Sequence, residues 1–213
     1  HDGDFLAFHS SATFERNVWF QFQVNSGFGD DIVAGATLVN LMNAQSDPRR
    51  PQYFGKTPNG TYGGVDINGV AGPNGISGLK GTRNDAGFRQ PIVTSDENSL
   101  ILAEANFVLH GAAAAQPFLD QERSSNGLSP LTATLQSIMT EKYIALFQNI
   151  EVWSDYKRTC LPALQPFDNP SFGGEIPGRL LAMGPDLEIV EPASMRAEIA
   201  ALAGGVSERY ATG

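Results

Sequence analysis

The chain has 213 residues, of which 41% are hydrophobic, and its formal net charge at pH 7 is −9. This length and apolar content are enough to bury a core, either as one domain over residues 1–213 or as part of a larger domain. The negative charge argues against binding to nucleic acid or to anionic membranes, whose phosphates would repel it. It favours a ligand that is neutral or held by polar contacts.

Neither a membrane-spanning helix nor a cysteine-based site is expected. The sequence lacks the roughly 18 consecutive apolar residues that a spanning helix requires. The single cysteine, Cys160, excludes an internal disulfide and cannot build a zinc cluster alone. We therefore expect no metal and no cofactor, and a partly buried thiol beside Leu161, since free cysteines usually behave as small hydrophobic residues.

The first 31 residues are rich in aromatic side chains. From Asn17 to Val24 apolar and polar residues alternate loosely, which predicts an extended segment with Val18, Phe20 and Phe22 on one side. Aromatic rings interleaved with amides are suited to a small-molecule surface. The alternative is that the rings fill a core, because aromatic residues dominate cores by area.

The apolar pattern of residues 34–44 predicts a short helix. It should end before Asp47-Pro48, because the residue that precedes a proline is pushed out of helical geometry. Asp47 and Arg49 are then placed to pair with each other or to cap the chain locally.

Residues 55–91 are punctuated by glycine and by Pro-Asn-Gly turns, which predicts a long glycine-rich loop insertion. The region has no phosphate-binding glycine motif, and the sequence from Asp66 to Gly69 lacks the third ligand and closing glutamate of a calcium loop. Loops of this length in compact domains are usually functional or mobile.

A helix is predicted from residue 95 to residue 110, with Thr94 and Glu97 at the spacing of a capping box and Gly111 as its C-terminal cap. The segment is apolar nearly all round, so we expect it to be buried on most sides. Glu104 is the one charge beyond its first turn, in the stretch from Ser99 to Gly111. A buried charge needs a partner, and we expect one among the Arg, Lys or Tyr side chains of residues 131–164. The alternative is a catalytic glutamate, but no second carboxylate or histidine stands at a spacing that would indicate acid–base catalysis.

A second, alanine-rich helix is predicted over residues 112–123, restarted at Pro117 and followed by a polar linker at residues 124–127. The central segment, residues 131–164, then begins with a long helix for which Ser129 is the expected N-cap and Pro130 the first helical residue. One face of that helix is apolar and should be buried. Its members are Leu135, Met139, Tyr143, Leu146 and Ile150.

The second half of the central segment packs aromatic, acidic and basic residues together before Pro162. We expect Trp153, Asp155 and Arg158 to fix the end of a helix in place, with charge pairs among the acidic and basic residues. Together with Glu104, these three are therefore predicted to be structural residues. Beyond residue 166 only residues 193–203 predict a further short helix. The succession of helix, turn, helix, linker and helix is typical of helical hairpins such as tetratricopeptide arrays, although no repeat period is visible.

The order of several local patterns resembles the C-terminal half of the SusD/RagB-like family of nutrient-binding outer-membrane lipoproteins. The most specific pattern joins Glu141-Lys142-Tyr143-Ile144-Ala145-Leu146 to Glu151-Val152-Trp153-Ser154-Asp155-Tyr156-Lys157-Arg158. The others are Asn17-Val18-Trp19-Phe20, Asp47-Pro48-Arg49 with Tyr53-Phe54, Leu102-Ala103-Glu104-Ala105, and Ile176-Pro177-Gly178-Arg179-Leu180-Leu181. The chain departs from the family at Val18, at Ala182-Met183-Gly184 and at Glu191-Pro192, which puts the geometry of the tail in doubt.

The resemblance implies a mainly α-helical fold of tetratricopeptide-like hairpins with long irregular loops, as the C-terminal part of a SusD-like domain. It implies a lipoprotein on the cell-surface side of the outer membrane, anchored through an N-terminal part that this chain does not include. It also implies a binding protein, not an enzyme, that captures a glycan or other nutrient and passes it to a TonB-dependent, SusC-like transporter.

The residues themselves agree with a role without catalysis. His1, His9 and His110 are widely scattered, and no Ser/His/Asp set or paired carboxylates stand at a site spacing. As ligand-binding residues we nominate Asn17, Trp19, Tyr53 and Tyr62, because ring faces and amides in irregular segments suit sugars. The alternative function is that of a structural scaffold that assembles with other chains through helical pairs and aromatic loops.

Overall fold

The computed structural model describes residues 3–24, 32–164, 197, 200, 201 and 203. Residues 1–165 form one compact unit, which contains all the labelled elements, and residues 166–213 form a second. The four described residues of the second unit are helical and belong to the helix predicted over residues 193–203. The rest of that helix, and the pattern at residues 176–181, lie outside the described residues.

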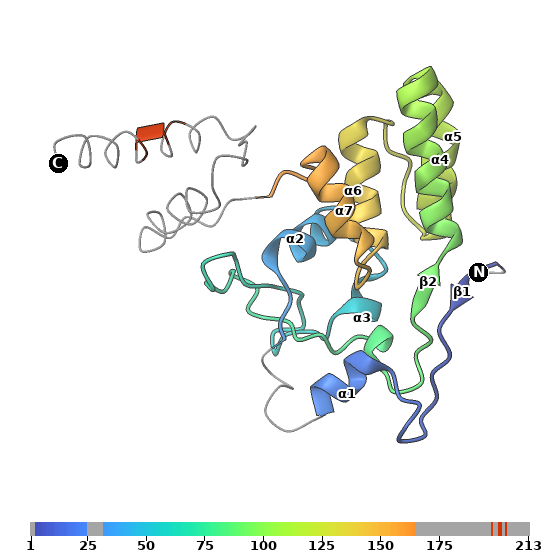
Figure 1. The fold of residues 1–213 in the computed structure, drawn as a ribbon. Coiled ribbons are helices and arrows are strands. Elements are labelled where there is room, and N and C mark those ends of the chain that lie inside the picture. The colour runs from blue at the N-terminus through green and yellow to red at the C-terminus, as the bar shows by residue number, and fades with distance from the viewer. Residues whose placement is uncertain (1–2, 25–31, 165–196, 198–199, 202, 204–213) are drawn as a thin grey trace, which may run out of the picture. The chain divides into compact units, whose positions relative to one another are not determined.

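The described part of the chain is mainly helical, as the sequence predicts (Figure 1). The strands β1 and β2 form a short antiparallel pair in which Phe5 lies opposite Val93. The elements in chain order are β1 (Phe5–Leu6), α1 (Val18–Val24), α2 (Ala36–Ala44), α3 (Arg50–Tyr53), the 3-10 helix η1 (Thr82–Asn84), β2 (Pro91–Val93), α4 (Ser95–His110), α5 (Ala112–Ser125), α6 (Leu135–Ala145) and α7 (Glu151–Thr159).

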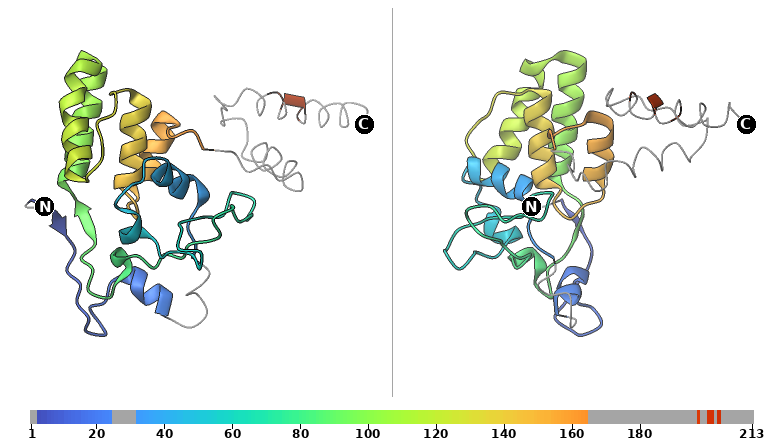
Figure 2. Two further views of the ribbon diagram at one scale, coloured as in Figure 1. Left: turned by 180° about the vertical axis from the view of Figure 1, so that it is seen from behind. Right: turned by 90° about the vertical axis from the view of Figure 1, so that its left-hand side faces the viewer.

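Helices α4 and α5 form an antiparallel hairpin, and α6 packs against α4 (Figure 2). Thr94 and Gly111 are confirmed as the cap residues of α4, but Glu97 does not complete the predicted capping box, and its buried Oε2 has no hydrogen-bond partner among the described residues. The Thr94 hydroxyl accepts the Glu97 N–H at 3.1 Å, and Gly111, with φ of +85°, reverses the chain in a conformation that side chains disfavour. One core lies between these three helices, built from Leu100, Ala103, Ala115, Leu119, Ala133 and Ile138.

A second core joins α2 and α3 to the end of α6. The Tyr53 and Phe147 rings are stacked with their centroids 4.5 Å apart, and Phe54 packs edge-on against Phe147. The aliphatic members include Leu38, Val39, Met42, Leu79 and Ile144. Helix α2 is thus the helix predicted over residues 34–44, and it ends before Asp47-Pro48 as expected.

Most of the predicted loop, residues 55–91, is irregular and packs back on the start of α2. Val65 donates its N–H to Ala34 O at 2.9 Å, and Ala36 donates its own to Val65 O at 2.7 Å. A Cβ added at Gly64 would lie 2.7 Å from Ala34 O. Glycine is therefore required at this position by the close approach of two backbones, and the loop has a defined course beside α2.

Three predictions for the helices are wrong. Residues 18–24 form helix α1 instead of an extended segment, because the Asn17 side chain accepts the Trp19 N–H at 2.8 Å and caps a helical turn. Helix α5 runs through Pro117 without a restart. Helix α4 is buried along one side only, and Ile101, Val108 and Leu109 are exposed, because the described elements that pack on it cover a single face.

The start of α6 and the state of Cys160 also differ from prediction. Helix α6 begins at Leu135 because Thr134, not Ser129, forms its N-cap. Met139 and Leu146 are buried as predicted, but Ile150 is 78% exposed because α6 ends at Ala145 and the chain then turns away at Gln148, where φ is +67°. Cys160 is exposed at the left-handed C-terminal cap of α7.

The capping box of α6 can be tested by substitution. Thr134 accepts the Ser137 N–H at 3.0 Å, and Ser137 Oγ accepts the Thr134 N–H at 2.9 Å. We expect Thr134→Ala to lower the free energy of unfolding by about 1 kcal/mol, since the Ser137 N–H loses its acceptor and the reciprocal arrangement is broken. Urea denaturation measures the loss. Thr132→Ala, an exposed threonine outside the helix, is the matched control and should change stability by less than about 0.5 kcal/mol.

Candidate binding site

The structure does not bring the four nominated ligand-binding residues together. Asn17 is fully buried, and its amide donates to Phe88 O at 3.0 Å. Tyr53 is 2% exposed, and its hydroxyl donates to Ile144 O at 3.0 Å. Both side chains hold the fold together, so a ligand from solvent does not reach them in this structure.

Tyr62 is half-buried and lines a pocket of about 430 Å³. We call this the Tyr62 pocket, and its other lining residues are Asn43, Arg50, Lys56, Gly60, Thr61 and Asn74. Trp19, the fourth nominated residue, is half-buried in α1 and does not line the pocket. Tyr53 lines a different polar pocket but is 2% exposed, so Tyr62 is the nominated residue that both lines a polar hollow and is open to solvent.

Contacts within the Tyr62 pocket fix its ring and polar groups in place. The Arg50 guanidinium lies 5.4 Å from the centre of the Tyr62 ring, and it donates to Asn43 Oδ1 at 2.9 Å. The Asn43 amide in turn donates to Tyr62 O at 2.9 Å. A ring, amides and cations on a shaped surface can hold a ligand that carries many hydroxyl groups. None of the residues that line this pocket is acidic.

A group of buried charged side chains lies between the α2–α3 turn and helices α5 and α6. We call it the buried charge cluster, and its members are Asp47, Arg49, Glu122, Arg123 and Glu141. Arg49 pairs with Asp47 at 2.7 Å, with Glu122 at 3.1 Å and also with Glu141. The predicted pairing of Asp47 with Arg49 is therefore confirmed, within a larger network that was not predicted from the sequence.

Glu122 is the member of this cluster whose negative charge is least favourable in the folded chain. Burial raises the pKa of its carboxyl to about 8, and the neighbouring Glu141 carboxylate acts in the same direction. Its Oε1 accepts from Arg49 and from Asn126, whereas its Oε2 is buried and has no hydrogen-bond partner among the described residues. A proton on Oε2 relieves both the desolvation and the repulsion.

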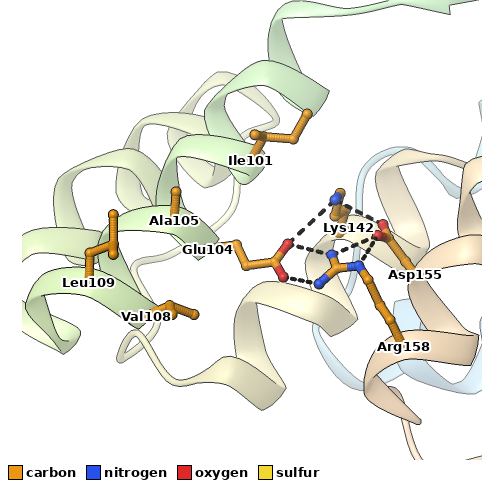
Figure 3. A pocket seen from close by; sticks show the side chains of 8 residues that line it. All are labelled: Ile101, Glu104, Ala105, Val108, Leu109, Lys142, Asp155 and Arg158. Carbon is orange, nitrogen blue, oxygen red and sulfur yellow. Dashed lines mark hydrogen bonds and ion pairs between the residues drawn. The ribbon is translucent and has the colours of Figure 1, made fainter.

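A second group of charges, the outer charge cluster, joins α4, α6 and α7 (Figure 3). Its members are Glu104, Lys142, Asp155 and Arg158. Lys142 lies 2.9 Å from Asp155 and 3.5 Å from Glu104, and Arg158 pairs with both carboxylates. The expectation that Glu104 has a partner in residues 131–164 is confirmed. Trp153 is not part of the cluster: it is 57% exposed and stacks on Tyr156.

Beside the outer charge cluster lies a hollow of about 450 Å³ on the exposed side of α4. Figure 3 shows apolar side chains of α4 next to the paired charges. They are Ile101, Ala105, Val108 and Leu109. Because the charges of the cluster already pair with one another, the hollow offers a ligand mainly apolar contact.

The charged clusters could in part have been anticipated. Glu141 and Lys142 interrupt the apolar stripe of α6, and Glu122 and Arg123 stand near the end of α5. Charged residues at core-facing helical positions indicate ion pairs, because unpaired charges are not tolerated there. Among the described residues, no group of three or more His, Cys, Asp or Glu side chains could hold a metal ion. No helix in the described part is long and apolar enough to cross a membrane.

Comparison with models of known protein families and with curated proteins gave no match. A functional assignment for this chain therefore rests on its own residues and their geometry.

Glu122 predicts a specific dependence of stability on pH. Since its pKa is raised in the folded state, the folded chain binds more protons than the unfolded chain between about pH 4.5 and pH 8. This contribution to stability is fully present below pH 4.5 and is lost as the pH rises to 8, with a slope of at most about 1.4 kcal/mol per pH unit.

We expect Glu122→Gln, which mimics the protonated side chain, to flatten the fall in stability that denaturant titrations record between pH 5 and pH 8. Glu15→Gln, at an exposed position, is the control and should leave the slope unchanged. A Glu122→Gln variant with the wild-type slope would contradict a raised pKa for Glu122.

Proposed function

We propose that the chain is part of a SusD/RagB-like nutrient-binding lipoprotein of the outer membrane. In this proposal its helices form tetratricopeptide-like hairpins of a SusD-like domain at the cell surface. The protein captures a glycan or other small nutrient and delivers it to a TonB-dependent transporter, without catalysis. In this proposal the protein is held at the membrane by a lipid anchor.

The observation that supports the proposal is the placement of the residues through which the chain resembles the family. The Asp-Pro-Arg pattern supplies Asp47 and Arg49 to the buried charge cluster, and Glu104 comes from the Ala-Glu-Ala helix. The most specific pattern supplies members of both clusters, namely Glu141, Lys142, Asp155 and Arg158. Patterns that are far apart in the sequence thus meet as the ion pairs that join the helices, as a shared framework would require.

The Tyr62 pocket supplies the ligand-binding part of the proposal. It is formed by the glycine-rich loop, by Arg50 of α3 and by the end of α2, and none of its lining residues belongs to either charge cluster. Loops carried by a rigid scaffold can vary without loss of the fold, which suits a protein whose framework is fixed and whose ligand differs between relatives. The ring of Tyr62 and the amides of Asn43 and Asn74 are the groups that we assign to sugar recognition.

The exposed apolar side chains of α4 favour a second candidate function, that of a scaffold that assembles with other chains. Val108 and Leu109 are 69% and 72% exposed, and contiguous apolar surface of this kind marks a packing face. In a nutrient-binding lipoprotein the same face would pack against further helices of a longer protein. The two functions differ in the partner that they require.

Affinity purification of the tagged natural protein from outer membranes distinguishes these functions. We expect a TonB-dependent barrel to co-purify, because the nutrient-binding protein must hand its ligand to a transporter. A variant with Val108→Asp and Leu109→Asp controls for capture through the apolar face. Polymers of the chain itself, without a barrel, would favour the scaffold.

The Tyr62 pocket is tested by substitution of its ring. We expect Tyr62→Ala to abolish the retardation of the protein in affinity gels that contain the glycan it binds, since the ring face supplies much of the contact with a sugar. Tyr156→Ala, a partly buried tyrosine of α7, is the matched control and should leave retardation unchanged. Equal retardation of wild type and Tyr62→Ala would remove this pocket from the proposal.

A further inference from the structure

A second polar pocket, of about 370 Å³, lies on another part of the same unit, and we call it the Arg83 pocket. Its walls come from η1, from the chain that leads into β2 and from the ends of α4 and α5. Its lining includes Arg83, Phe88, Arg89, Asp96, Ser125 and Asn126, and also the acid Asp4 and the ring of Tyr53. It shares no lining residue with the Tyr62 pocket.

Arg83 is a buried cation that pairs with no carboxylate of the described residues. Its side chain is 7% exposed, and its Nε has no hydrogen-bond partner in the described part of the chain. The guanidinium lies over the rings of Tyr53, Phe88 and Phe147, at 5.0, 5.6 and 5.7 Å from their centres. The rings and the Tyr53 hydroxyl attract the positive charge, but none of them carries the full negative charge of a counterion.

The other charges that line the pocket are already compensated. Arg49 is paired within the buried charge cluster, and Arg89 is exposed and lies over the ring of Phe8. The two acids stand at the start of α4, where the helix dipole favours negative charge. Asp4 accepts the Ser95 N–H at 2.8 Å, and Asp96 accepts from the Asn126 amide at 3.3 Å. Among the described residues that line the pocket, Arg83 is thus the one charge with neither a counterion nor exposure to water.

We propose that the Arg83 pocket binds the carboxylate of a small hydroxylated acid, such as a sugar acid. The guanidinium of Arg83 holds the carboxylate, since its planar fork matches the two oxygens. The side-chain oxygens of Asn126, Ser125 and Asp96 lie in the same pocket and accept hydrogen bonds from the ligand's hydroxyl groups. The Asn126 N–H groups remain bonded to Glu122 and Asp96. The ring of Phe88 supplies an apolar surface for the face of the ligand. This site is independent of the Tyr62 pocket and of any transporter.

Calorimetric titration of the full chain with D-glucuronate, and with D-glucose as the neutral counterpart, tests the proposal. We expect glucuronate to bind at least tenfold more tightly than glucose, and Arg83→Met to lower the glucuronate affinity by tenfold or more. The control is Arg16→Met, which removes a guanidinium that lies 5.6 Å from the ring of Phe20, away from the pocket. Arg16→Met and Tyr62→Ala should both bind glucuronate like the wild type.

Equal affinity for glucuronate and glucose in the wild type, or unchanged glucuronate affinity in a folded Arg83→Met variant, would overturn the proposal. If Arg83→Met does not fold, amide chemical shifts of the wild-type chain decide the matter. Saturable shifts confined to residues 82–91 and 125–126 support the site. Shifts confined to residues 60–62 and 74 would place the acid in the Tyr62 pocket and overturn it, as would no saturable shift at all.

Discussion

Arg49 is the side chain on which the arrangement of the first unit depends. It lies in the short turn between α2 and α3, yet it pairs with Glu122 of α5 and Glu141 of α6, 73 and 92 residues further along the chain. At 4% exposure its charge has lost nearly all contact with water, and this cost is offset only while its hydrogen-bond acceptors on Asp47, Glu122 and Glu141 stay in place. The network therefore selects one mutual position of the turn and the two helices, because any displacement would leave a buried charge without its partner.

The outer charge cluster also joins helices through ion pairs, but its side chains are more exposed to water. Arg158 has 45% of its side chain exposed, so water screens its pairs with Glu104 and Asp155 and each contributes little to stability. Through Arg158, helix α7 is therefore joined to α4 less firmly than the α2–α3 turn is joined to α5 and α6, whereas the buried pair of Lys142 and Asp155 holds α7 to α6. In both clusters the charged side chains form ion pairs with one another, so they offer few free charges to a ligand. Free polar groups are left mainly to the loops, and both pockets that could hold a polar ligand draw on residues outside the regular helices.

The sequence predicted those features of the fold that depend on neighbouring residues, such as helix boundaries and caps. Helix α4 and its caps follow from Thr94 and Gly111, and the need of Glu104 for a partner follows from its position in an apolar helix. The start of α6 was misjudged because Pro130 is compatible with a helix, whereas the reciprocal bonds of Thr134 and Ser137 decide the boundary. The burial of Asn17 and Tyr53 could not be predicted, because their partners Phe88 and Ile144 are 71 and 91 residues away. Residues chosen for their chemistry alone therefore included two that are enclosed by the fold.

The net charge of −9 at first argues against an acidic ligand, but the distribution of charge matters more than its sum. At physiological ionic strength the potential of exposed charges falls off over about 8 Å, so distant carboxylates repel an approaching acid only weakly. Within the Arg83 pocket, Asp4 and Asp96 are held at the start of α4, whereas Arg83 has rings in place of a counterion. A ligand carboxylate would meet this cation in a weakly solvated place, where an ion pair is stronger than at the surface. The overall charge would then slow the approach of the acid more than it weakens the final complex.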